Sequence, residues 1–102
     1  SAKREFMNVV DAAEAVYFLM KFYKKYELIN LGTGFDLTIK ELAELIKNKT
    51  GFQGKIIWNT DMPNGMPQKL LDVSKLNSLG FKPKISLEDG IEEMIKIYKN
   101  SL

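Results

Sequence analysis

The chain has 102 residues, of which 45% are hydrophobic, and it carries a formal net charge of +2. A chain of that length fits one domain that hides roughly two-thirds of its unfolded surface. Basic and acidic residues are interleaved, so no basic stripe forms, and this argues against binding to nucleic acid.

Two residue types are missing from the sequence, and each absence excludes a kind of chemistry. Without cysteine there is no disulfide, no thiolate nucleophile and no thiolate-bound metal, which suits a reducing, cytoplasmic location. Without histidine the commonest metal ligand and general base near neutral pH is lost. No apolar run approaches about 18 residues and no signal-peptide pattern opens the chain, so we expect no membrane contact.

The first predicted helix starts at Asp11. Asp11 is a suitable N-cap, and Glu14 completes the capping pattern. Apolar residues then recur every three or four positions, at Ala12, Ala15, Val16, Leu19, Phe22, Tyr23 and Tyr26. The run "YELINL", residues 26–31, predicts a short strand that ends at Gly32.

The second predicted helix starts at Thr38. Thr38 and Glu41 have the spacing of a capping box, and Gly51 is placed to end the helix. After it, "KIIWN", residues 55–59, predicts a second strand. The following "TDMPNGMPQ", residues 60–68, is rich in turn residues and predicts a loop.

Two more helices are predicted in the last third of the chain. A short one covers residues 74–79 and is stopped by Gly80, and Ser86 caps the final one. The fold class is therefore small α/β, with three to four helices and two to three short strands in a single domain, 1–102.

A glycine-rich turn in "INLGTGFDLTIKEL", residues 29–42, has the layout of a phosphate-binding loop. A dinucleotide fingerprint would need a third glycine where Leu37 stands, and the lysine of a P-loop is absent as well. The turn is therefore interpreted as a plain connection from strand to helix, which binds no nucleotide.

Other candidate residues have ordinary interpretations. Tyr17 and Lys21 have the spacing of a catalytic tyrosine and lysine, but that spacing arises by chance in a helix rich in both types. Asp61 and Asp72 have no second carboxylate at a telling spacing. Arg4 and Lys69 are either solvent-facing charges or ligand-binding cations, and the residues alone leave both possibilities open.

Four segments, taken in order, resemble a known family: "REFMNVVDAAEAVYFLM", "INLGTGFDLTIKELAELI", "PNGMPQKLLD" and "LGFKPKISLEDGI". They are similar to the C-terminal part of extended short-chain dehydrogenase/reductases that act on nucleotide sugars, the NAD-dependent epimerase/dehydratase family. Within it, the resemblance is greatest to GDP-L-fucose synthases, which convert GDP-4-keto-6-deoxy-D-mannose to GDP-L-fucose with NADPH.

The resemblance implies that the chain is the substrate-binding part of a larger enzyme and is inactive alone. In the family the NADP-binding loop and the catalytic residues lie upstream of the arginine that matches Arg4. NADPH would therefore be bound by a missing N-terminal Rossmann domain, and the 102 residues would hold no cofactor, metal or catalytic residue. The full-length form is expected to be a homodimer.

The resemblance also implies which residues bind substrate. Arg4 and Lys69 match family residues that contact the diphosphate of the nucleotide sugar, and Asn64 stands where the family usually has an aspartate beside the substrate. Asn8, Val10 and Gln68 depart from the family pattern. Alternatives are a related GDP-6-deoxy or GDP-heptose substrate, another nucleotide-sugar epimerase/dehydratase, or a binding module without chemistry of its own.

Overall fold

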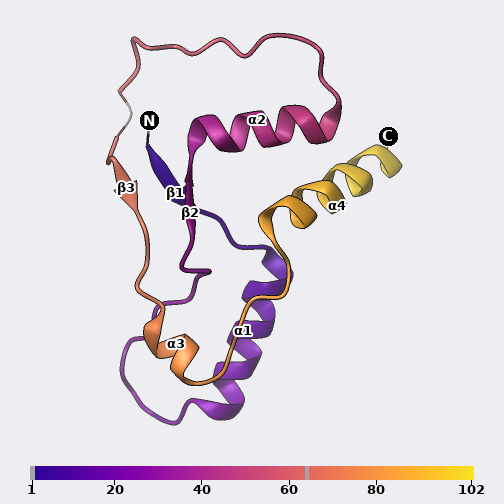
Figure 1. Ribbon diagram of the computed structural model, residues 1–102. Coiled ribbons are helices and arrows are strands. Elements are labelled where there is room, and N and C mark those ends of the chain that lie inside the picture. Colours follow the sequence, from indigo (N-terminus) through magenta and orange to yellow (C-terminus); the bar gives the residue numbers. More distant parts are fainter. Residues whose placement is uncertain (1, 64) are drawn as a thin grey trace.

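The computed structural model describes residues 2–63 and 65–102. Within these residues the chain forms four helices and three short strands, in the small α/β class that the sequence predicts. In chain order they are β1 (Lys3–Glu5), α1 (Val9–Phe22), β2 (Asp36–Thr38), α2 (Ile39–Thr50), β3 (Gln68–Lys69), α3 (Ser74–Ser78) and α4 (Leu87–Asn100). Helices α1 and α3 lie at one end of the molecule and α2 and α4 at the other (Figure 1).

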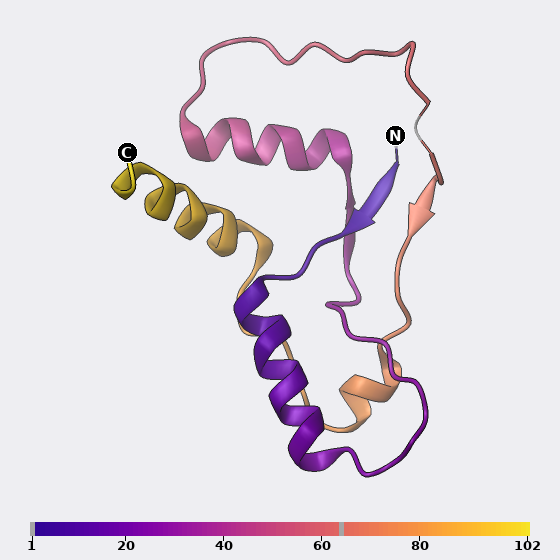
Figure 2. The same cartoon turned by 180° about the vertical axis from the view of Figure 1, so that it is seen from behind.

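The three strands form one small sheet in the order β2-β1-β3 (Figure 2). Strand β1 pairs antiparallel with β2, and it pairs parallel with β3. Backbone hydrogen bonds extend the pairing beyond the strand ends, because Lys3 N–H donates to Pro67 at 2.8 Å and Ile39 N–H donates to Ala2 at 3.0 Å. The N-terminal residues are thereby held between two segments that lie far apart in the sequence.

Helix α1 begins earlier than predicted, and Asp11 is not its N-cap. The cap is Asn8, whose side chain accepts a hydrogen bond from Val10 N–H at 2.8 Å. Asp11 is 1% exposed and accepts from the backbone N–H groups of Lys84 and Ile85, at 3.0 and 2.9 Å. Its carboxylate therefore joins α1 to the segment before α4. The predicted helix continued to Tyr26, whereas α1 ends at Phe22.

The start and end signals predicted for α2 and the start signal predicted for α4 are confirmed. Thr38 accepts from Glu41 N–H at 3.0 Å while the Glu41 carboxylate accepts from Thr38 N–H at 2.9 Å, which makes the capping box. Gly51 ends α2 in the left-handed region at φ 73°, and Ser86 caps α4. The two helices pack together, with Lys49 of α2 at 2.8 Å from the Glu88 carboxylate of α4.

The hydrophobic core is small and lies between α1 and α3. Its buried members are Ala15, Val73, Leu76 and Phe81. Partly buried side chains that pack against it are Met7, Phe18, Leu19, Ile29 and Leu31. The radius of gyration of 16.4 Å exceeds the value of about 13 Å typical of a compact domain of this size.

The two strands predicted at residues 26–31 and 55–59 were wrong. Residues 26–31 and 55–59 have no strand pairing in the described part of the chain. The first segment still alternates, since Leu28 is 95% exposed while Ile29 and Leu31 pack against the core. A strand requires a hydrogen-bonded neighbour as well as a suitable pattern, and these segments have none here. The strands that do form have two or three residues, too few to show a period.

Candidate functional site

The sheet brings together the two cations that the sequence leaves ambiguous. Arg4 of β1 and Lys69 of β3 are register partners in the parallel pair. Residues directly opposite each other on adjacent strands project from the same face of the sheet. The guanidinium and the ammonium groups therefore start from neighbouring backbone positions on one face, although no local feature of the sequence connects them.

The surroundings of the two cations leave them available to an anion. Arg4 Nη1 donates to the Lys3 carbonyl at 2.7 Å, and Lys69 is exposed. Within residues 2–63 and 65–102, the ion pairs involve Lys49 and Lys75 instead. A bidentate fork beside a flexible ammonium is a suitable arrangement for a phosphate or diphosphate group.

The loop that precedes β3 lies against Arg4. Arg4 Nη2 lies 3.6 Å from the point where a Cβ of Gly65 would stand, and Gly65 has a φ of 74°. Asn64, the third predicted substrate contact, lies outside the described residues. Gln68, which departs from the family pattern, donates to Asp36 Oδ2 at 2.6 Å and so connects β3 to β2 across the sheet.

The glycine-rich turn holds a carboxylate of the chain itself. Glu5 Oε2 accepts from Gly34 N–H at 2.5 Å and from the Thr33 hydroxyl at 3.2 Å. Gly34 has a φ of 81°, which favours glycine, and a Cβ on Gly32 would stand 2.8 Å from the same oxygen, so a side chain there would have to displace the carboxylate. The turn does have the anion-binding layout, and its anion is Glu5.

Sequence reasoning missed Glu5. Its partners on the turn are at least 28 positions away, so no local pattern reveals the contact. The same carboxylate reaches the segment after β3, where Glu5 Oε1 accepts from Leu71 N–H at 3.4 Å. The only available signal was a glycine turn of anion-binding type for which the chain offers no nucleotide motif.

Of the two isolated aspartates, Asp72 has a structural role. Its carboxylate accepts from the backbone N–H and the hydroxyl of Ser74, at 3.0 and 2.6 Å, which fixes the start of α3. The hydrogen bond from the Ser74 hydroxyl is the main cause that lowers the pKa of Asp72 below its ordinary value. Asp61 is exposed in the loop.

The tyrosine and lysine with catalytic spacing contact each other on the surface of α1. Lys21 Nζ lies 5.2 Å from the ring centroid of Tyr17, which is 61% exposed on α1. A cation over an aromatic ring at an exposed site contributes about 0.5–1 kcal/mol. The closeness of Tyr17 and Lys21 is therefore explained by a weak contact on the surface of the helix.

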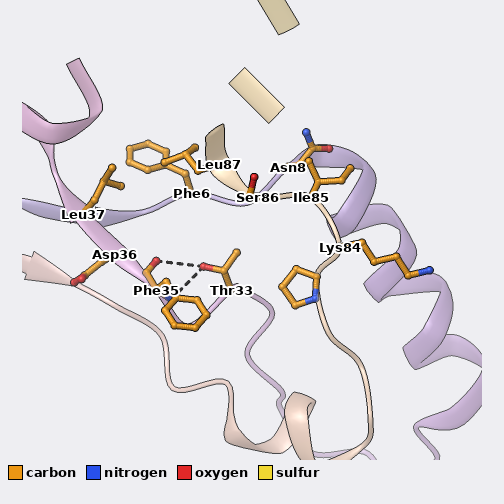
Figure 3. Close-up of a pocket in the computed structure, with 11 residues that line it drawn as sticks. Phe6, Asn8, Thr33, Phe35, Asp36, Leu37, Lys84, Ile85, Ser86 and Leu87 are labelled. Carbon is orange, nitrogen blue, oxygen red and sulfur yellow. Dashed lines mark hydrogen bonds between the residues drawn. The ribbon is translucent and has the colours of Figure 1, made fainter. Parts of the chain in front are cut away.

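A cavity of about 500 Å³ adjoins the glycine-rich turn, which lines it with Thr33 and Phe35. Figure 3 shows Phe6 and Leu87 on one side of it and Phe35 on the other, with the Thr33 hydroxyl bonded to Phe35. The lining is mostly apolar and includes neither Arg4 nor Lys69.

No group of three or more acidic side chains that could hold a metal ion occurs among the described residues. Nor does any described helix have the length and apolarity to cross a membrane.

Comparison with known proteins gives the class to which this arrangement corresponds. No family model matches the chain. By sequence and fold, the chain corresponds to the C-terminal part of nucleotide-sugar epimerases and reductases of the extended short-chain dehydrogenase/reductase family.

The particular relatives are GDP-L-fucose synthases and GDP-sugar reductases. The chain is 52% identical over 98 residues to a putative GDP-L-fucose synthase 2 of Arabidopsis thaliana, a match that covers 96% of this chain and 30% of the relative. A GDP-6-OMe-4-keto-L-xylo-heptose reductase from Campylobacter jejuni superposes with a TM-score of 0.92 at 38% identity, over 100% of this chain and 32% of that one.

A second similar structure was solved with a cofactor bound to that protein. The GDP-mannoheptose C4 reductase from Campylobacter jejuni, with NADP bound, superposes on this chain with a TM-score of 0.84 at 40% identity. The match covers 96% of this chain and 32% of the reductase. The chain thus spans about a third of the length of the proteins it matches.

Proposed function

We propose that the chain is the substrate-binding part of an NADPH-dependent GDP-sugar epimerase/reductase of the GDP-L-fucose synthase type. The observation that supports this most directly is the register pairing of Arg4 with Lys69. A diphosphate carries about two negative charges, which suits a guanidinium and an ammonium held on one face of a sheet. Asn64, next to Gly65, would add a neutral hydrogen-bonding contact.

The chemistry would come from the rest of the protein. The chain has no cysteine and no histidine, and Tyr17 and Lys21 form an exposed contact on the surface of α1. NADPH would also be held elsewhere, because the glycine turn that could receive a phosphate is filled by the Glu5 carboxylate. This part alone is therefore expected to be inactive. A cytoplasmic location and a homodimeric complete enzyme are further parts of the proposal.

A GDP-heptose substrate is the second candidate. Both solved structures described above are GDP-heptose reductases, at 38% and 40% identity. The plant relative, a putative GDP-L-fucose synthase at 52% identity, favours the substrate of that type instead. The two sugars share the GDP group that Arg4 and Lys69 would bind, so the cation pair does not distinguish them.

The test is NADPH oxidation by the complete protein that contains this chain, with each keto-sugar in turn. We expect oxidation that depends on a GDP-sugar, and none from the purified 102 residues. Absence of oxidation with every GDP-sugar, together with no GDP binding, would support the alternative of a binding module without chemistry. Conversion of a UDP-sugar alone, without net NADPH oxidation, would assign the chain to another nucleotide-sugar epimerase or dehydratase.

A further inference from the structure

The Glu5 side chain contacts both of the segments that adjoin Arg4 and Lys69. One of its oxygens is held by Gly34 N–H and the Thr33 hydroxyl, and the other is held by Leu71 N–H. Gly34 precedes β2 and Leu71 follows β3, so the carboxylate connects the segments next to both outer strands of the sheet.

We propose that Glu5 is a positioning residue for anion binding by Arg4 and Lys69. The proposal rests on the proposed function of that pair. Glu5 follows Arg4 in β1, so its side chain projects from the opposite face of the sheet. It acts through the backbone, by fixing the strand that carries each cation.

The dependence of Lys69 on Glu5 follows from the shortness of β3. A strand of two residues, Gln68 and Lys69, has few ladder hydrogen bonds to hold its register. The bond from Leu71 N–H to Glu5 anchors the chain two residues beyond Lys69. On the other side of Lys69, Gln68 is held by Asp36. Lys69 is thus fixed between two side-chain contacts on the opposite face.

The position of the Glu5 carboxylate also determines how its negative charge affects Arg4. A carboxylate beside Arg4 in the sequence could neutralise the guanidinium and weaken its attraction for an anion. In the structure the Glu5 carboxylate is occupied by Gly34 and Thr33 instead. The glycine turn thereby holds the Glu5 carboxylate on the face of the sheet opposite to Arg4 and Lys69.

Substitutions of Glu5 in the complete protein separate this role from simple stabilisation. Glu5→Gln keeps an oxygen for Gly34 and Thr33, but its amide NH₂ group cannot accept from Leu71 N–H. Glu5→Ala removes both contacts. Glu44→Gln, on the exposed side of α2, is the matched control for the loss of a carboxylate. The ligand is GDP, titrated by calorimetry below the melting temperature of every variant, with NADPH titrated in parallel.

We expect Glu5→Gln to weaken GDP binding by roughly three- to tenfold, and Glu5→Ala to weaken it further. NADPH affinity should stay at the wild-type value in both. In a double-mutant cycle, Glu5→Gln should have a much smaller effect on GDP binding once Lys69→Met is present, because both act on one contact.

Two results would overturn the proposal. If the Glu5 variants have lower melting temperatures but wild-type GDP affinity, the carboxylate only stabilises the fold. If their effects add fully to that of Lys69→Met, Glu5 does not act through the lysine. Failure of the proposed function has a different signature, since GDP binding would then be insensitive to Arg4→Lys and Lys69→Met themselves, and the role of Glu5 would fall with it.

Discussion

At the scale of single residues, the proposed function depends most on the two cations. Arg4 and Lys69 are neighbours only because β1 and β3 pair in parallel. No periodicity or cap in the sequence could place them together, and only the family resemblance pointed to both. The structure adds the physical reason why a residue near the start of the chain can act with one in its last third.

Lys69→Met in the complete enzyme should weaken GDP binding roughly ten- to a hundredfold. A charge-assisted hydrogen bond contributes about 1.5–3 kcal/mol, and 1.4 kcal/mol corresponds to a tenfold change. Arg4→Lys should also weaken binding, because an ammonium cannot replace a two-pronged guanidinium. NADPH affinity and melting temperature should barely move, which calorimetry and thermal unfolding would check. Wild-type GDP affinity in the Lys69→Met enzyme would remove the residue-level support for a GDP-sugar substrate.

Asp11 shows a residue whose chemistry was recognised while its partner was not. The sequence indicated a hydrogen-bond acceptor near the start of α1, which is correct, but the donors are Lys84 and Ile85 rather than the first turn of the helix. Asn8, one turn earlier, takes the capping role. A long-range acceptor and a local cap look the same in a sequence.

Asp11→Ala should destabilise the chain by about 2 kcal/mol, because it leaves two part-buried backbone N–H groups without their acceptor. Asp11→Asn keeps one oxygen as an acceptor and should cost less. Urea unfolding followed by circular dichroism measures both, and Glu93→Ala, an exposed position on α4, serves as the control. A loss for Asp11→Ala no larger than that of the control would show that the buried carboxylate contributes nothing.

At the scale of elements, helices were predictable and strands were not. Caps at Thr38, Gly51 and Ser86 are local signals whose donors and acceptors lie within four residues, so the sequence alone identifies them. The pairing of β1 with β2 and β3 joins residues that lie more than 30 positions apart. Segment 26–31 has the alternation of a strand but lacks a partner within the described chain.

The contact between α2 and α4 should make stability depend on pH in the acidic range. The hydrogen bond and charge of Lys49 lower the pKa of Glu88 below its ordinary value of 4.5. The unfolded chain therefore binds this proton more readily than the folded chain. The contribution of Glu88 is complete above about pH 4.5 and is lost as the pH falls through the lowered pKa.

Acid unfolding of Glu88→Gln should accordingly be shallower than that of the wild type. Glu93→Gln, also on α4 and exposed, is the matched control and should leave the profile unchanged. The free energy of unfolding by urea, measured from pH 3 to pH 7 at low salt, is the readout, because screening weakens an exposed pair. Identical acid profiles for Glu88→Gln and wild type would mean that Lys49 and Glu88 do not interact in solution.

At the scale of the whole molecule, the chain leaves an extensive apolar surface uncovered. We define the outer face of α1 as Val9, Val10, Ala13, Val16, Tyr17 and Met20. Val9 and Met20 are 77% and 76% exposed, and the spacing of the set gives one continuous stripe along the helix. A monomer rarely exposes so large a patch unless another surface covers it. If the chain is part of a longer protein, as the proposed function requires, we expect the rest of that protein to cover this surface.

The 102 residues alone should therefore be folded but self-associating, because a second copy is one means of covering the outer face of α1. Sedimentation velocity at increasing concentration should show a rising fraction of dimer or larger species. Met20→Glu should shift the distribution towards monomer, since a charge on the stripe is costly to bury. Thr60→Glu makes the same charge change in an exposed loop and should leave association unchanged, so equal effects of the two substitutions would indicate general charge repulsion. A strict monomer at high concentration would contradict the prediction, and it would mean that the exposed stripe is tolerated in water without a partner.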